Sequence, residues 1–274
     1  MKSDLLIVIR CAGEDIGFVI DTYQAVQYYT SDSTEVVFAV DGGNEKFAKK
    51  LVDLFGEKKI YVAMRHWGWG AGLYSLLVES YLYFRNIYEF NHLQSIDYDT
   101  LYIGEGADKM LLDKINSDKI GLLGAYRSHN EHWKMQINKE KEKFGRTFGK
   151  IPLTCFSGEG IQGGWMTLAR VLLDKMEKRK MFEPPFSVAK DYTGIADDHL
   201  LPIFVRMCGL EIVDASNFVC CNWKAREDPR GLEKKGVKVF HPTKLVPHNK
   251  NKSTEIEIRN YFRRIRKCPY LLKL

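Results

Sequence analysis

Residues 98–111 of this 274-residue chain read YDTLYIGEGADKML, and this stretch indicates the fold class. The apolar run 101–103 is typical of a short buried strand, and it stops at Gly104. Two acids, Glu105 and Asp108, follow before a helical pattern begins. Carboxylates placed after a buried strand of an α/β sheet lie where such sheets bind ligands, and two of them on one turn suit a hard cation. The alternative is an ordinary strand-to-helix turn with Asp108 as the helix N-cap.

The first half of the chain alternates apolar runs with helical patterns. Four runs are expected to be strands: 5–9, 36–40, 60–63 and 101–103. Amphipathic helices separate them, and this β-α-β-α-β-α-β order predicts an α/β fold with a mostly parallel sheet and helices on both faces. The second half is expected to add strands at 120–125, 210–213 and 237–240, helices at 165–178 and 200–208, a charged excursion at 129–150 and a Gly-rich loop at 155–164. Pro202 is expected in the first turn of its helix, because a proline further in breaks a helix.

The chain is predicted to be one compact domain over residues 1–245, followed by a basic extension over residues 246–274. Residues 215–274 hold 15 Lys and Arg against 5 Asp and Glu, a net charge of +10, which leaves −4 for the rest of a chain whose total is +6. This asymmetry indicates either a surface for a polyanion, such as nucleic acid or an anionic glycan, or a solvated basic tail. No apolar run approaches the ~18 residues of a membrane helix and no basic-then-apolar leader is present, so we expect a cytoplasmic protein without a transmembrane segment.

Six motifs follow one another along the chain: VDGGNE from Val40, RHWGWGAG from Arg65, IGEGAD from Ile103, IQGGWMTLARVLLDKM from Ile161, ADDHLLPIFVRMCGLEI from Ala196 and VFHPTK from Val239. In this order they resemble the nucleotide-sugar glycosyltransferases of the GT-A fold, broadly the large inverting family, over roughly residues 4 to 245. The resemblance implies a GT-A-like sheet that holds the nucleotide at the ends of its first two strands, at Arg10 and Asp41. It also implies nucleotide contacts from Arg65 and Gly70, because their loop precedes the long helix as the family's loop does.

The family's cation motif is Asp-x-Asp after an apolar strand. At IGEGAD the resemblance implies displaced acidic ligands, Glu105 and Asp108, with Glu105 also close to the nucleotide sugar. VFHPTK implies a late metal ligand, His241, for which a partly buried structural histidine is the alternative. The cofactor that follows is a divalent cation, Mn²⁺ or Mg²⁺, which stabilises the charge of a diphosphate leaving group.

Two further motifs imply the groups around the reacting sugar. IQGGWMTLARVLLDKM is similar to the family's GGFxxxRRxxLxxxG segment, which implies that Gly163, Gly164 and Trp165 lie against the donor sugar, since glycine lets the backbone approach closely. ADDHLLPIFVRMCGLEI is similar to GEDxxLSLRLRxAGYRI, which implies Asp198 as the catalytic general base and Asp197 as the acid before it. Helix capping is the alternative for this acidic pair.

The C-terminal stretch 259–267 is expected to form a helix that presents cations to a polyanionic acceptor. Its inward residues are expected to be Ile265 and either Tyr261 or Phe262. The side chains expected to face outward are Arg259, Arg263, Arg266 and Lys267, and the predicted acceptor-binding residues are Arg263, Arg264 and Arg266.

The resulting hypothesis is an inverting glycosyltransferase, for a hexose or a pentose, that moves a sugar from a nucleotide-sugar donor to a hydroxyl group. Two acceptors are left open: a hydroxymethylated base of phage-type DNA in the host cytoplasm, or a cell-surface glycan. A sugar-1-phosphate nucleotidyltransferase is one alternative, although RCAGEDIG after the first strand is short and acidic for that class. A non-enzymatic nucleic-acid-binding protein is the other, and it would leave Asp197 and Asp198 without a role.

Overall fold

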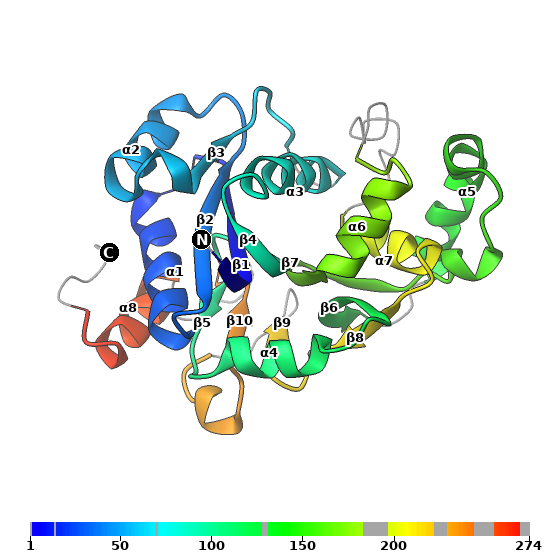
Figure 1. The fold of residues 1–274 in the computed structure, drawn as a ribbon. Helices are drawn as coiled ribbons and strands as arrows, with labels where there is room; N and C mark the ends of the chain where they lie inside the picture. Colours follow the sequence, from blue (N-terminus) through cyan, green and yellow to red (C-terminus); the bar gives the residue numbers. More distant parts are fainter. Residues whose placement is uncertain are drawn as a thin grey trace.

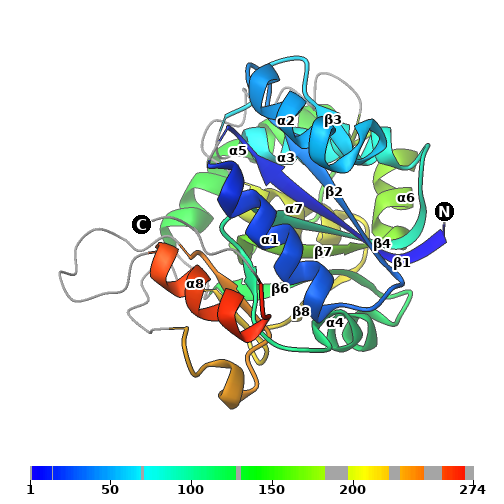
Figure 2. The same ribbon diagram turned by 90° about the vertical axis from the view of Figure 1, so that its left-hand side faces the viewer.

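The computed structural model describes residues 2–13, 15–68, 71–127, 131–182, 197–221, 229–243 and 255–268. These residues build a seven-stranded sheet with helices on both faces, and a second, three-stranded sheet packs on one of those faces (Figures 1 and 2). The predicted mostly parallel α/β architecture is confirmed. None of the helices in this described part of the chain combines the length and the hydrophobicity that crossing a membrane requires.

The large sheet places its parallel strands side by side. In spatial order its strands are β3 (Ile60–Val62), β2 (Thr34–Val40), β1 (Lys2–Cys11), β4 (Glu89–Asp97), β7 (Gly160–Ala169), β6 (Ile120–Arg127) and β8 (Glu211–Asp214). The first four run parallel, β7 runs antiparallel between β4 and β6, and β6 and β8 are parallel. Strands β1 to β4 therefore end at one common edge, where open α/β sheets bind ligands.

Helices and the small sheet cover the two faces. The helices are α1 (Ile16–Tyr29), α2 (Glu45–Phe55), α3 (Ala71–Phe84), α4 (Ala107–Ile115), α5 (Glu131–Phe148), α6 (Arg170–Lys178), α7 (Asp197–Met207) and α8 (Glu255–Ile265). The small sheet has the order β5 (Leu101–Tyr102), β10 (Val239–His241) and β9 (Val219–Cys221). Successive strand residues point to opposite faces, so Leu6 and Val8 of β1 pack with α3, α6 and α7. Leu5 and Ile7 pack with α1, α2, α4, α8 and the small sheet.

Strand β4 is an element for which sequence analysis predicted no strand. Its sequence EFNHLQSID contains polar residues that interrupt the apolar pattern, yet Gln94 and Ser95 are fully buried. Gln94 is accommodated there because its amide donates to the hydroxyl of Thr167 at 3.1 Å. The run 101–103, predicted as the fourth strand of the parallel sheet, instead supplies β5, which pairs antiparallel with β10 in the small sheet.

The second half of the chain also departs from its predicted elements. Residues 160–169, expected to be a loop and the start of a helix, form β7, because strands on both sides satisfy its backbone groups. Helix α6 begins only at Arg170. The charged stretch predicted as an excursion is helix α5. Pro202 is the sixth residue of α7 rather than a first-turn residue, because that helix begins at Asp197, three residues earlier than predicted.

Helix α8 packs on α1 as part of the folded body (Figure 2). Arg259, Arg263 and Arg266 all pair with the fully buried carboxylate of Asp21 on α1; the Nη1 atoms of Arg259 and Arg263 lie 2.9 and 3.0 Å from its oxygens. The prediction that these three arginines face outward is therefore wrong. A buried carboxylate requires cationic partners, and it draws the charged face of the helix inward.

The remaining side chains of α8 divide between core and solvent. Ile258 and Phe262 are fully buried in the core, so the alternative of Phe262 as an inward residue is confirmed. Ile265, expected inward, is 43% exposed. Arg264 is exposed, and it is the member of the predicted acceptor-binding set that faces solvent.

Replacing Asp21 with alanine leaves three buried guanidinium groups without their shared carboxylate. We expect Asp21→Ala to lower the free energy of unfolding by about 3–5 kcal/mol, the range for removing one partner of a buried ion pair. Asp174→Ala is the control, because Asp174 and Arg170 form an exposed pair on α6 that contributes about 0–1 kcal/mol. Urea unfolding followed by circular dichroism measures both variants, and equal small losses would show that Asp21 does not hold α8 in place.

Candidate active site

Arg10 gathers the polar residues at the carboxyl edge of the parallel strands. It stands opposite Asp97 in the register of β1 and β4, and it is only 2% exposed. Its Nη2 lies 2.7 Å from Asp97 Oδ1, and its Nη1 lies 2.7 Å from Asp197 Oδ2. Nη2 also donates to the carbonyl of Gly163. Sequence analysis expected Arg10 to contact the nucleotide sugar, but these groups of the protein occupy its guanidinium, which joins β1, β4, β7 and α7.

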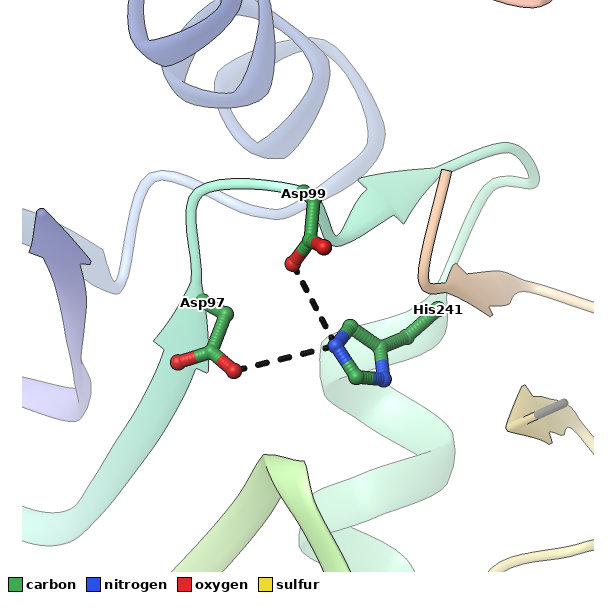
Figure 3. Close-up of side chains that lie close together, drawn as sticks. All are labelled: Asp97, Asp99 and His241. Atoms are coloured by element: carbon green, nitrogen blue, oxygen red, sulfur yellow. Dashed lines mark ion pairs between the residues drawn. The ribbon is translucent and has the colours of Figure 1, made fainter. Parts of the chain in front are cut away.

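Two acids and a histidine face one another (Figure 3), and one of them, Asp97, is the partner of Arg10. Nε2 of His241, at the end of β10, lies 3.3 Å from Asp99 Oδ1 and 3.7 Å from Asp97 Oδ2. The side chains of His241 and Asp99 are 0% and 5% exposed, whereas that of Asp97 is 21% exposed, so the group opens to solvent on the Asp97 side. Its potential ligand atoms all lie within 4.8 Å of one another. Carboxylate oxygens with one imidazole nitrogen fit Mn²⁺ or Mg²⁺, and the nitrogen favours Mn²⁺.

Two glycines of β7 allow this close packing. A Cβ atom on Gly164 would lie 2.0 Å from Cε1 of His241, and one on Gly163 would lie 2.7 Å from Oδ1 of Asp197. Any larger residue therefore displaces one of these side chains. Sequence analysis expected a donor sugar against the two glycines, and the structure places His241 and Asp197 there.

The two acids predicted for catalysis open helix α7. Burial raises the pKa of Asp197 to about 6; Arg10 opposes the rise and Asp198 adds to it. The backbone N–H of Asp198 donates to Asp197 Oδ1 at 3.0 Å. Asp198 itself is 5% exposed, and its Oδ1 lies 3.9 Å from Nε2 of His199. Asp197 is thus committed to Arg10, while Asp198 stands next to it at the same helix start.

The buried side chain of Asp41 holds the backbone of the loop that follows β3. Its carboxylate accepts hydrogen bonds from the backbone N–H groups of residues 67 and 68 at 2.7 and 3.0 Å, and the side chain is 4% exposed. The guanidinium of Arg65 stacks 3.7 Å from the ring centroid of Trp67 and is exposed. Of the predicted nucleotide-binding residues here, Asp41 supports the loop and Arg65 lies on its surface. Gly70 lies outside the described residues.

The structure does not bring Glu105 and Asp108 to the histidine. Oδ2 of Asp108 accepts hydrogen bonds from the backbone N–H of Ser31, at 2.8 Å, and from its hydroxyl, in the connection between α1 and β2. That connection lies at the amino end of the parallel strands, whereas Asp97 lies at their carboxyl end. Glu105 is exposed near the same connection. Glu105 and Asp108 therefore do not join His241 as the predicted cation ligands. The helix that follows β5 begins near the amino end of the parallel strands, whereas His241 lies near their carboxyl end.

Sequence analysis missed Asp97 and Asp99, which the structure places beside His241. The signal was present, since Asp97-Tyr98-Asp99 is itself an Asp-x-Asp sequence at the end of a strand. The polar residues of β4 interrupt the apolar pattern of that strand, so the strand was predicted at the next apolar run, residues 101–103. Trp165, expected at the donor sugar, is fully buried in the core.

Comparison with solved structures shows which fold this chain shares. No protein-family model and no curated protein matches the chain. The galactosyltransferase LgtC, in complex with donor and acceptor sugar analogs, matches with a TM-score of 0.51 at 14% identity, over 98% of this chain and 97% of that chain. The chain has the GT-A fold.

Two further solved structures are similar over most of this chain. The apo form of mouse xyloside xylosyltransferase 1 matches with a TM-score of 0.47 at 14% identity, over 88% of this chain and 97% of that chain. The mannosyltransferase PcManGT from Pyrobaculum calidifontis, in complex with GDP-Man and Mn²⁺, matches with a TM-score of 0.43 at 12% identity, over 78% of this chain and 55% of that chain.

A methyl group at Gly164 tests the packing of the histidine. Because His241 is fully buried, we expect Gly164→Ala to displace its ring, to destabilise the protein by about 1–3 kcal/mol through overpacking, and to weaken Mn²⁺ binding. Gly145→Ala in α5 is the control: a Cβ there meets nothing within 4 Å, and alanine stabilises a helix interior by up to about 1 kcal/mol. Thermal unfolding and calorimetry with Mn²⁺ measure the two effects. Unchanged stability and Mn²⁺ affinity in Gly164→Ala would contradict the packing described above.

Proposed function

We propose that this chain is a glycosyltransferase that moves a sugar from a nucleotide-sugar donor to a hydroxyl group of a glycan. The observation that carries the proposal is the group formed by Asp97, Asp99 and His241 at the carboxyl edge of a GT-A sheet. Ligands of open α/β sheets bind at that edge. The LgtC structure, whose fold this chain shares, holds donor and acceptor sugar analogs.

In this proposal Asp97, Asp99 and His241 hold a divalent cation, Mn²⁺ or Mg²⁺. When bound, the cation supplies positive charge to the diphosphate group that leaves the sugar. Arg10 orients the first ligand: it holds Oδ1 of Asp97, and Oδ2 then faces His241. The positive charge of Arg10 also reduces the repulsion between the carboxylates of Asp97 and Asp99, so the two can lie close together before any cation binds.

We infer that Asp198 is the general base and that Asp197 positions it. Asp197 is bound to Arg10, whereas Asp198 follows directly at the start of α7. The acceptor oxygen attacks the anomeric carbon, the bond from that carbon to the diphosphate oxygen breaks, and the acceptor proton passes to Asp198. A single displacement of this kind inverts the anomeric configuration.

The acceptor that we propose is a glycan hydroxyl rather than DNA. The DNA hypothesis rested mainly on the basic C-terminal stretch, and two of its three predicted acceptor-binding arginines, Arg263 and Arg266, are buried against Asp21. For the donor, we propose that the nucleotide lies along the loop that Asp41 supports, where the exposed guanidinium of Arg65 stacks on the partly buried ring of Trp67.

Removing the proposed ligands tests the cation. We expect Asp97→Asn, Asp99→Asn and His241→Ala each to lower sugar transfer by at least about 100-fold, because a cation supplies several kcal/mol and each 1.36 kcal/mol is a factor of ten. Glu105→Gln is the control, since Glu105 is exposed and lies away from the group. Mass spectrometry of products from UDP-sugar and GDP-sugar donors with oligosaccharide acceptors measures transfer. Full activity in excess EDTA would show that no cation is required.

Asp198→Asn tests the base. We expect transfer to fall by about 10²–10⁴-fold while the KM for the donor stays within a few-fold, because a base acts on the acceptor and contributes little to donor binding. Asp197→Asn should differ from it by also lowering the free energy of unfolding, since it weakens the ion pair with Arg10. NMR of the product should show inversion. Near-normal turnover in Asp198→Asn, or a product with retained configuration, would overturn the assignment.

A further inference from the structure

The turn that carries Asp97 and Asp99 is held through its backbone by residues remote in sequence. The N–H of Thr243 donates to the carbonyl of Asp99 at 2.8 Å. The carbonyl of Tyr98, between the two acids, accepts a hydrogen bond from Nη2 of Arg259 at 2.9 Å. Each acid of the turn thus neighbours a carbonyl that a distant segment fixes.

Arg259 connects this turn to the body of the protein. The side chain is fully buried, and its Nη2 also lies 3.1 Å from the hydroxyl of Thr243, the residue that holds Asp99. Its Nη1 lies 2.9 Å from Asp21, and its Nε lies 2.9 Å from Glu255. The planar guanidinium therefore binds two carboxylates, a carbonyl and a hydroxyl together, which the compact ammonium group of lysine cannot do.

We propose that Arg259 is a positioning residue for the cation site, so that helix α8 helps to hold the cation ligands in place. The inference rests on the proposed function, because it takes Asp97, Asp99 and His241 as the cation ligands. Neither acid is touched by Arg259 itself. It acts through the backbone of Tyr98, whose carbonyl position determines where the carboxylates before and after it point. Groups that orient metal ligands in this way typically change metal affinity 10- to 100-fold when they are lost.

Arg263 provides a matched control on the same helix. It also pairs with Asp21, at 3.0 Å, and it contacts Gln24, so it shares the ion-pair network with Arg259. Both of these partners, Asp21 and Gln24, lie on α1. Lysine at position 259 or 263 keeps a cation near Asp21, and the two variants therefore differ in what they do to Tyr98.

The test compares Arg259→Lys with Arg263→Lys by calorimetry, using Mn²⁺ in the presence of UDP and of GDP. We expect the Kd for Mn²⁺ to rise at least about tenfold in Arg259→Lys and to stay within about twofold in Arg263→Lys. Transfer by Arg259→Lys should recover at high Mn²⁺, with a raised KM for the cation and a kcat close to that of the wild type. A loss of folded protein would instead lower kcat at every Mn²⁺ concentration. Equal Mn²⁺ affinity in both variants would overturn the proposal.

Hydrogen exchange of residues 97–103 separates this inference from the proposed function. We expect faster exchange of this peptide in Arg259→Lys than in Arg263→Lys, with or without Mn²⁺. If the wild type binds no Mn²⁺, the cation site is refuted, and the exchange rates alone decide whether Arg259 holds the turn. Should Arg259→Lys not fold, Thr22→Val replaces it, because the hydroxyl of Thr22 donates to the same Tyr98 carbonyl and Thr22 is fully buried. Unchanged exchange in the variant that is measured would show that the turn does not depend on that donor to the Tyr98 carbonyl.

Discussion

The ion pairs of Arg10 are the interaction on which the site depends. A guanidinium that is 2% exposed has lost its hydration, and it is stable only where several acceptors surround it. Asp97, Asp197 and the Gly163 carbonyl supply them, from β4, α7 and β7. These elements are far apart in the sequence, so the arginine at the end of β1 fixes their relative positions. The orientation of Asp97 follows, because only its second oxygen remains for His241.

The rest of the site is arranged so that charged side chains can approach the sheet closely. Gly163 and Gly164 give β7 no side-chain bulk where Asp197 and His241 pack, and β7 itself lies between β4 and β6. The small sheet brings His241 to the edge through β10, and β5 follows directly on the turn that carries Asp99. Arg10, on the large sheet, thus holds Asp97 and Asp197 in place, and the small sheet supplies His241.

Much of the parallel sheet was predictable, because its strands are continuous apolar runs. Strands β1, β2 and β3 and their helices follow from local periodicity, and so does the expectation that ligands bind at their carboxyl ends. Strand β4 did not follow, since Gln94 and Ser95 are polar. Only the partner Thr167 on β7 makes the burial of Gln94 acceptable. Strand β7 did not follow either, because its glycines resemble a loop until the neighbouring strands are known.

The α/β class and the parallel strands β1 to β3 could be predicted from the sequence alone. So could four residues that the structure gathers around Arg10 or beside Asp97 and Asp99: Gly163, Gly164, Asp197 and His241. Which acids join His241 depends on how the strands and helices pack. Asp97 and Asp108 are both acids close to a strand end, and local sequence cannot tell at which edge of the sheet each will lie. The packing of the chain also determines which way the arginines of the basic C-terminal helix face. These arginines carry the same charge whether they face solvent or a partner, and the buried carboxylate of Asp21, more than two hundred residues earlier, draws three of them inward.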